Sequence, residues 1–528
     1  MACPQKSQVV RFGEIGFLFL AMILPGIACN YPGQPNLSNN LPGETLRKTL
    51  SAQEAATSSV APVITTTSGI GGVAATELPS PAAPTPGGVF NYTTRPGDTL
   101  TALQKRFSAP LEQYLVSQEL PVTGFLPSGA ILTIPDVLDA GIPLTPANLL
   151  LPDGEAINSP TSADFSVPQF VQEAGGFLSR YQEKVDGNPM NGAEIVQRVA
   201  SESSVNPRLL LAFLEFRTDS TGIGTGWVYG QPAPGANLDS PLGFAVPGHR
   251  GLYQELVMAA THMNIGYYGW REGTNVELRY SNGKTARIHP LLNPGSAGLQ
   301  NLFAKLYEPG PWQEALYGQE NFITRYQQMF GDPWQRVAMI DPLLPDGLSQ
   351  PVLELPFARG ESWSLSGGPH PSWNTGSPRG ALDFSPVTGE AVCAVSKAWA
   401  RASAPGIVAR AAHNVVALDL DGDGFEQTGW VLVYVHLANS EMVEEGKTVT
   451  VDEPLGHPSC ERGQSTGKHV HVARKYNGEW LPADGPLPFI LSGWQAQAGE
   501  RNYQGSLVKG DQVVSANPSG ARSSVIKR

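Results

Sequence analysis

Residues 463–473 read GQSTGKHVHVA, and the centre of this stretch is the triplet His469-Val470-His471. The turn residues before it and the apolar Val472 and Ala473 after it predict a β-strand. Side chains at positions i and i+2 of a strand point to the same face. Both imidazoles can therefore reach one cavity, so the stretch predicts a histidine site carried by a β-sheet.

The rest of residues 350–515 supplies partners for this pair. Residues 431–437, VLVYVHL, predict a second strand that ends in His436. His370 lies in the loop sequence Gly-Gly-Pro-His, and Asp383 lies in the strand-like ALDF, where a carboxylate needs a partner. Two neutral imidazoles, one carboxylate and one open position suit a catalytic zinc ion. Such an ion polarises a peptide carbonyl and lowers the pKa of a bound water to about 7.

Three stretches together resemble the lysostaphin-type zinc endopeptidases, and within them the β-lytic or staphylolysin branch. They are GGPHPSWNTGSPRGALDF (367–384), VYVHLA (433–438) and GQSTGKHVHVA (463–473). In most of that superfamily a ligand histidine stands four residues before the aspartate, but here that position holds Arg379, which cannot ligate. The β-lytic branch has a long loop instead, and His370 stands thirteen residues before Asp383, as that branch requires.

The resemblance implies a role for each residue of the site. It makes His370, Asp383 and His471 the zinc ligands, and His436 and His469 catalytic histidines that do not bind the metal. The remaining histidines match no motif of the family; they are His249, His262, His289, His413 and His457.

Of the four cysteines, only Cys393 and Cys460 fall in sequence that predicts a folded domain. In an oxidising compartment a lone pair suggests one disulfide, and two buried thiols are the alternative. Cys460 also matches a disulfide cysteine of the β-lytic branch, whereas Cys393 matches less well.

The run DLDGDG at residues 419–424 resembles the start of a calcium loop. An EF-hand needs a glutamate at position 12 of the loop, and that position holds Trp430. Because strands are predicted on both sides, we expect a β-hairpin tip here.

The first 28 residues predict an export signal. Lys6 and Arg11 precede an apolar run over residues 15–24, which is too short to span a bilayer. The following PGIAC resembles the end of a bacterial lipoprotein signal, which implies a lipid on Cys29 and attachment to a membrane. Ordinary cleavage with secretion, or an uncleaved anchor, is the alternative. In each case we expect an exported protein at the cell surface or in the periplasm.

Residues 29–89 are rich in Ser, Thr, Pro, Ala and Gly and predict a flexible tether. Residues 90–136 predict a strand, two helices and a closing strand, with the second helix running from Pro110 to Leu115. With YTTRPGDTL (92–100) and LPSGAILTIP (126–135) at its ends, this unit resembles a LysM module. The resemblance implies binding of N-acetylglucosamine-containing glycans between the loop 124–126 and the loop Gly97, Asp98, Thr99 and Leu100. A LysM fold without glycan affinity is the alternative.

Residues 137–170 return to linker composition, and residues 171–340 predict a mostly helical domain. Within it, SSVNPRLLLAFLEFRTDSTG (203–222) and MNIGYYGW (263–270) distantly resemble a lysozyme-like transglycosylase, which would make Glu215 a general acid. The Ser-Gly pair that usually follows this glutamate is absent, and Arg217 nearby would lower its pKa. A helical spacer or binding domain is therefore the favoured interpretation.

The composition limits the partners. Charged residues are 16% of the chain and the net charge is −12, so the chain lacks the basic surface that nucleic-acid binding needs. The sequence predicts a multidomain α+β protein with a LysM domain, a helical domain and a mostly antiparallel β catalytic domain. The expected function is zinc-dependent hydrolysis of peptide bonds in peptidoglycan, with LysM bound to the glycan. The alternatives are an inactive wall-binding regulator and a bifunctional hydrolase with Glu215 active on glycan.

Overall fold

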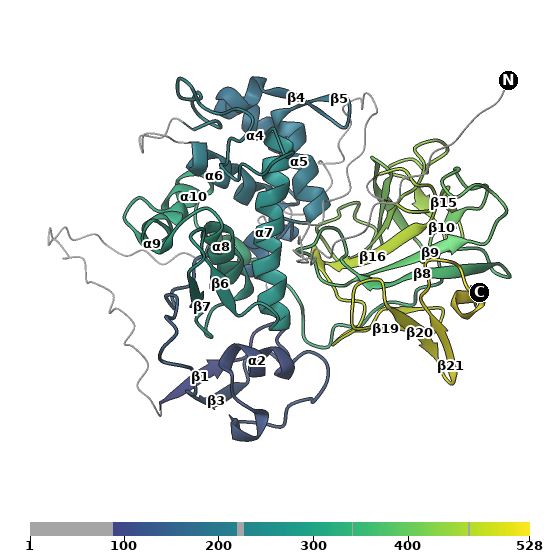
Figure 1. Ribbon diagram of the computed structural model, residues 1–528, viewed down its shortest axis with the longest axis horizontal. Coiled ribbons are helices and arrows are strands. Elements are labelled where there is room, and N and C mark those ends of the chain that lie inside the picture. The colour runs from purple at the N-terminus through teal and green to yellow at the C-terminus, as the bar shows by residue number, and fades with distance from the viewer. Residues whose placement is uncertain (1–87, 219–225, 341, 463–464) are drawn as a thin grey trace, which may run out of the picture.

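The computed structural model describes residues 88–528 apart from 219–225, 341 and 463–464. The predicted signal segment, Cys29 and the predicted tether up to residue 87 lie outside the described residues. In the described part the protein is a mixed α+β fold whose sheets are mostly antiparallel (Figure 1). No helix in these described ranges is long and apolar enough to cross a membrane.

The N-terminal module, residues 88–136, is a three-stranded sheet with one α-helix. Its strands lie in the order β1-β3-β2, and Thr99 caps the helix by accepting a hydrogen bond from the Ala102 backbone. The elements are β1 (Val89–Thr93), α2 (Leu100–Phe107), β2 (Leu115–Val116) and β3 (Ile131–Pro135).

The predicted second helix of this module is wrong. Leu111–Gln113 forms one 3₁₀ turn, and Leu115 then pairs with Thr133 of β3. A six-residue helix gains too few hydrogen bonds to offset its nucleation, whereas pairing with β3 satisfies the same backbone groups.

The predicted linker at residues 137–170 is also wrong, because this segment is folded into the helical domain. It contains α3 (Asp153–Ala156) and the start of α4 (Val167–Ala174), and Leu151 and Ile157 are buried in the core. The polar and proline residues that suggested a linker act as helix caps and turns instead, as Ser166 does when it caps α4.

The helical domain is mostly helical in its described residues, as the sequence predicts. The further helices are α5 (Gly192–Ser203), α6 (Pro207–Thr218), α7 (Leu252–Glu272), α8 (Pro294–Ala304), α9 (Pro309–Tyr317), α10 (Phe322–Phe330) and α11 (Pro333–Val337). The domain also contains two small hairpins. One pairs β4 (Gln182–Val185) with β5 (Asn188–Asn191), and the other pairs β6 (Glu277–Arg279) with β7 (Thr285–Arg287). The long helix α7 lies at the centre and packs closely against α8, where Gly298 contacts Met263.

The C-terminal domain is built on a nine-stranded sheet in the order β14-β11-β12-β13-β16-β9-β8-β22, with β17 paired to β16. Its strands are β8 (Ser362–His370), β9 (Ala381–Pro386), β11 (Gly406–Ala412), β12 (Val415–Asp419), β13 (Trp430–Val435), β14 (Thr448–Val449), β16 (Val470–Tyr476), β17 (Glu479–Trp480) and β22 (Val525–Lys527). Smaller sheets pair β10 (Ala400–Arg401) with β15 (Pro454–Gly456) and join β18 (Ile490–Leu491), β19 (Trp494–Ala498), β20 (Gly505–Lys509) and β21 (Gln512–Ser515). Because β22 completes the edge beside β8, this domain extends past the predicted boundary at residue 515.

The two faces of the large sheet enter different cores. One face packs within the C-terminal domain through residues such as Leu382, Phe384, Val416, Leu418, Leu432, Tyr434, Val470 and Val472. The opposite face joins the core of the helical domain through Ala381, Val415, Ala417, Val431, Val433, Val435 and Ala473. The helical domain therefore packs against one face of the sheet.

Buried histidines predict how the stability of this fold depends on pH. Burial lowers the pKa of His262, His289 and His413 to about 4, whereas a histidine in an unfolded chain titrates near 6.5. Between these two values the unfolded chain binds protons that the folded chain does not, so the free energy of unfolding should fall as the pH drops from about 6.5 to 4. Equilibrium unfolding across this range measures the slope. His262→Gln should reduce the slope relative to the parent chain.

Candidate metal centre

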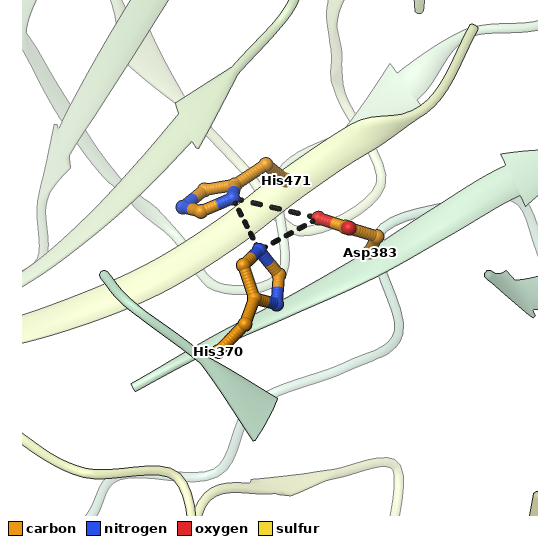
Figure 2. Close-up of side chains that lie close together, drawn as sticks. All are labelled: His370, Asp383 and His471. Carbon is orange, nitrogen blue, oxygen red and sulfur yellow. Dashed lines mark hydrogen bonds and ion pairs between the residues drawn. The ribbon is translucent and has the colours of Figure 1, made fainter. Parts of the chain in front are cut away.

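Three side chains from three neighbouring strands converge on one point (Figure 2). His370 ends β8, Asp383 lies in β9 and His471 lies in β16. Nε2 of His370 is 3.0 Å from Nδ1 of His471, and Oδ1 of Asp383 is 3.3 and 3.4 Å from these two nitrogens. All three side chains are buried.

The outer nitrogens of both histidines fix their tautomers. Nδ1 of His370 faces the Gly368 carbonyl at 2.9 Å, and Nε2 of His471 faces the Ser372 carbonyl at 3.0 Å. A carbonyl can only accept a hydrogen bond, so each of these outer nitrogens carries the proton. The inner nitrogens then present lone pairs to each other and to Oδ1 of Asp383, an atom buried without a hydrogen-bond donor.

Three acceptor atoms that face one another repel unless a cation lies between them. Bonds of about 2.0–2.1 Å from zinc to nitrogen or oxygen place tetrahedral ligands roughly 3.3 Å apart, which matches the spacing here. The carbonyls that hold the outer nitrogens are also the usual partners of metal-bound histidines. These residues therefore fit a metal ion.

The backbone that carries this group is specialised at two positions. In the sheet His471 pairs with Asp383, and Gly367 pairs with Asp383 from the other side. A Cβ on Gly367 would lie 2.4 Å from Oδ2 of Asp383, so only glycine fits beside the carboxylate. The pairing of β8 with β9 also shifts register between Gly367 and His370, which turns the end of β8.

The two other predicted histidines lie beside the metal group. The ring of His436 lies 4.5 Å from that of His469 and 6.2 Å from that of His471. Nε2 of His469 is 3.7 Å from Oδ1 of Asp383. His436 directly follows β13 and has a φ of 66°, which breaks the strand alternation and lets its ring lie near His469 and His471.

The surroundings of His436 keep it neutral. Burial lowers the pKa of His436 well below its usual value, and the neighbouring His469 and His471 lower it further. Its Nδ1 faces the carbonyl of Glu461 at 3.1 Å, so Nδ1 carries the proton and Nε2 is the acceptor.

Two further features of the site carried no motif in the sequence. The ring of Tyr503 stacks on His370 with centroids 4.2 Å apart, and its side chain is 55% exposed at the edge of the site. Arg379, which stands where most of the superfamily has a ligand, donates to the carbonyls of Pro369, Gly499 and Arg501 and so ties the loops together. Neither role could be found from local sequence, because both depend on contacts with the distant segment 499–503.

Cys393 and Cys460 form a disulfide, and neither lies in the core, so they are not two buried thiols. The bond joins the loop after β9 to the segment that leads to His469. The DLDGDG run forms the expected hairpin tip between β12 and β13. Asp419, Asp421 and Asp423 lie close enough to share a cation, but Asp419 already accepts hydrogen bonds from three backbone amides of the tip.

Glu215 is fully buried and not presented at a surface. Its Oε2 accepts hydrogen bonds from the backbone of Val228 at 2.8 Å and Tyr229 at 3.4 Å, and Arg325 is 3.9 Å from Oε1. Arg217 bonds the Leu242 carbonyl instead of the carboxylate. These contacts tie the end of α6 to the segment at Val228 and Tyr229, and they leave the carboxylate of Glu215 away from the surface.

The predicted glycan loop faces the inside of the protein. Asp98 is buried and paired with Arg106 at 2.8 Å. Gly97 lies so close to α7 that a Cβ there would be 2.6 Å from Nη1 of Arg271 and 2.8 Å from Leu344. The segment 137–170 therefore does not hold this module apart from its neighbours.

The two histidines and one carboxylate on this antiparallel sheet form a candidate metal site, and comparison with known proteins places the chain among metallopeptidases. It is 30% identical to the beta-lytic metalloendopeptidase of Lysobacter enzymogenes over 167 residues, which are 30% of this chain and 84% of the relative. The chain belongs to the β-lytic metalloendopeptidase family.

Other comparisons cover more of the chain. Protease LasA of Pseudomonas aeruginosa (strain UCBPP-PA14) is 25% identical over 335 residues, which are 59% of this chain and 72% of that protein. Residues 149–343 match the family described as LasA, N-terminal domain, so the region that resembles a lysozyme-like enzyme in sequence matches a different family. Among solved structures, the M23 metalloprotease pseudoalterin has 23% identity and a TM-score of 0.27 over 32% of this chain and 96% of that one.

The metal set makes a direct prediction. His370→Ala leaves two protein ligands, so the variant should lose both its bound divalent metal and its peptidase activity. Metal content by mass spectrometry, set against peptide hydrolysis, measures the two together. The control is His457→Gln, a histidine of the same domain outside the group, which should keep about one metal ion per chain. A His370→Ala chain with full metal content would contradict the ligand assignment.

Proposed function

We propose that this chain is a zinc endopeptidase that hydrolyses peptide bonds of bacterial peptidoglycan, with His370, Asp383 and His471 as zinc ligands. The observation that carries the proposal is the convergence of three lone-pair donors at 3.0–3.4 Å in a buried site. The membership in the β-lytic metalloendopeptidase family supports peptide hydrolysis. The lysostaphin-type stretches and the LysM-like ends of the N-terminal module favour the cell wall as the substrate.

When bound, zinc at these ligands would polarise a peptide carbonyl and acidify a water molecule. The protein supplies the proton transfers. His436 is neutral and can accept a proton at Nε2, because the Glu461 carbonyl holds its Nδ1 proton. His469 is anchored in the same way at Nδ1 by the Gly467 carbonyl at 2.7 Å. Its Nε2 lies 3.7 Å from Oδ1 of Asp383 and is an acceptor while the ring is neutral. Once Nε2 has taken up a proton from the attacking water, the imidazolium can donate it to the oxyanion or to the leaving amine.

The full chain holds this site closed. Asp383 and His471 lie on the face of the sheet that the helical domain covers, because they alternate with the Leu382 and Val472 of the other face. On the loop after His370, Gly376 packs against α7, where a Cβ would be 2.4 Å from the Thr261 carbonyl. We propose that a peptide reaches the site only when the helical domain moves off the sheet.

A buried ion pair fastens this cover beside the site. Arg462 of the segment before His469 pairs with Glu202 of α5 at 2.5 Å and lies over the Trp373 ring at 4.6 Å. Burial would raise the pKa of Glu202, but Arg462 and Arg198 outweigh it and lower that pKa to about 2. The pair therefore stays charged at every physiological pH.

We further propose that the N-terminal module binds wall glycan and that a signal at the N-terminus exports the chain, with Cys29 as the lipid attachment point. A regulator without activity is the second candidate. It is disfavoured because the described residues retain the complete ligand set and both additional histidines. A glycan-cleaving role is disfavoured by the burial of Glu215.

Mass spectrometry of purified peptidoglycan after digestion tests the proposal. New peptide termini support the endopeptidase, new glycan ends support the bifunctional hydrolase, and unchanged fragments support the regulator. The His370→Ala chain serves as the control, and its products should equal those of an undigested sample.

The two histidines that are not ligands should separate metal binding from turnover. His436→Ala and His469→Ala should keep the metal and lose about 10²–10⁴-fold in turnover, because each removes one proton-transfer or oxyanion group. Metal content and turnover on a short peptide are measured for both variants. A metal-free His436→Ala or His469→Ala chain would mean that the residue is a ligand.

Weakening the cover should activate the full chain. Glu202→Gln leaves Arg462 buried without its charge partner, a change that typically costs about 3–5 kcal/mol in the closed state. We expect faster hydrolysis of a short peptide by this variant than by the parent chain. Glu173→Gln, an exposed residue of α4, is the matched control. Equal rates for the two variants would argue against a cover that limits access.

A further inference from the structure

The N-terminal module and the helical domain cap each other's helices. The guanidinium of Arg106, at the end of α2, donates to the carbonyls of Trp270 and Arg271 at the end of α7, at 3.0 and 3.3 Å. In return Arg287 of the helical domain donates to the carbonyls of Lys105 and Arg106 at the end of α2, at 2.8 and 2.9 Å. The last carbonyls of a helix lack partners within it, and a cation there also interacts favourably with the helix dipole. The Trp270 carbonyl also accepts a hydrogen bond from the Gly273 amide of its own helix end. Docking of the module adds the Arg106 bonds at the end of α7 and the Arg287 bonds at the end of α2.

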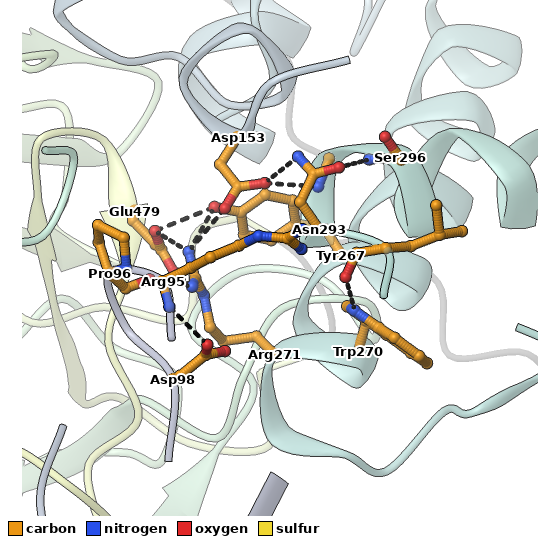
Figure 3. A network of polar contacts seen from close by, with 12 residues as sticks. Arg95, Pro96, Asp98, Asp153, Tyr267, Trp270, Arg271, Asn293, Ser296 and Glu479 are labelled. Carbon is orange, nitrogen blue, oxygen red and sulfur yellow. Dashed lines mark hydrogen bonds and ion pairs between the residues drawn. The ribbon is translucent and has the colours of Figure 1, made fainter. Parts of the chain in front are cut away.

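Arg271 extends this contact to the C-terminal domain (Figure 3). Its guanidinium bonds both carboxylate oxygens of Glu479 in β17, at 2.8 and 3.0 Å, and the Pro96 carbonyl of the module at 2.7 Å. Arg271 and Glu479 are both buried, so either charge would be costly without the other. One side chain thus joins all three parts of the protein.

Gly97 allows this joint to form. It has a φ of +80°, and the absence of a Cβ lets the backbone lie directly on Nη1 of Arg271. A second contact lies nearby, where Asp346 of the segment between the helical and C-terminal domains accepts hydrogen bonds from the backbone and hydroxyl of Ser128.

We infer that the docked N-terminal module is a latch that holds the helical domain over the metal face of the sheet, closed by Gly97 against Arg271. The consequence of this inference, that release of the latch exposes a peptidase site, rests on the proposed function. The same edge of the module is where the proposed function places the wall glycan. Glycan binding and the closed latch therefore exclude each other, so contact with the wall would favour the open state.

Gly97→Ala is the test, because its Cβ would lie 2.6 Å from Nη1 of Arg271. Gly129→Ala is a matched control in the same module. It has nearly the same φ, +83°, with no atom within 4 Å of an added Cβ, so it reproduces the backbone strain without the clash. If Gly97→Ala does not fold, Asp346→Ala removes the second contact without straining the module and should give a smaller effect of the same sign.

Opening is measured on the full chain by carbodiimide labelling of carboxylates, read by mass spectrometry. Glu202 of α5 is buried where the helical domain meets Arg462 of the C-terminal domain. Its labelling rate therefore reports how often the helical domain separates from the sheet, and it does not depend on metal or activity. We expect Gly97→Ala to label Glu202 at least about tenfold faster than Gly129→Ala, with the exposed Glu173 labelled equally in both. Equal labelling of Glu202 in the two variants would overturn the inference that the module acts as a latch.

Two added measurements distinguish failure of the latch from failure of the proposed function. Faster labelling of Glu202 in Gly97→Ala without faster peptide hydrolysis would support the latch inference and contradict the peptidase proposal. An N-acetylglucosamine oligomer added to the parent chain should raise Glu202 labelling as Gly97→Ala does. If the oligomer has no effect while Gly97→Ala raises Glu202 labelling, the result supports the latch inference and contradicts the proposal that the module binds glycan.

Discussion

The architecture depends on the large sheet being buried on both faces. Valines and alanines of β12, β13 and β16 fill the core of the helical domain, while the alternate residues of the same strands fill the core of the C-terminal domain. Burial of apolar surface is the dominant favourable contribution to folding and has no directional requirement of its own. Polar contacts therefore decide how the helical domain is oriented, and they are supplied by buried arginines at the edges of the interface.

This constraint sets up a conflict between stability and activity. The metal group lies on the covered face because a strand sends alternate side chains to opposite sides, and His471 shares its side with Ala473. A peptide substrate needs an open groove at this position, whereas the apolar face needs a cover. Arg462 forms the ion pair with Glu202 that holds the cover, and the neighbouring Glu461 positions His436. The same short segment therefore contributes to both the cover and the site.

The metal group itself illustrates how backbone carbonyls determine side-chain chemistry. Gly368 and Ser372 hold the outer imidazole protons, which leaves the inner nitrogens as lone-pair donors beside a carboxylate. The loop between His370 and Asp383 supplies both Ser372 and the contact of Gly376 with α7. The same loop thus shapes the metal group and contacts the cover, which couples the two physically.

The sequence by itself determined the composition of the candidate site. The alternation from His469 to His471 is local, and strand geometry converts it directly into two side chains on one face. The place of His370 and Asp383 in the site is what the family resemblance implies from their spacing. The sequence also predicted that residues 171–340 are mostly helical, as they are in the described part of this range. It failed at residues 110–115 and 137–170, because strand pairing with β3 and docking of capped turns on a distant core are contacts that local composition does not contain. Only the tertiary structure decided that the metal face is covered, that Gly97 lies against Arg271, and that Glu215 is buried. Each of these depends on segments that are far apart in the chain and are brought together by burial of one shared apolar face.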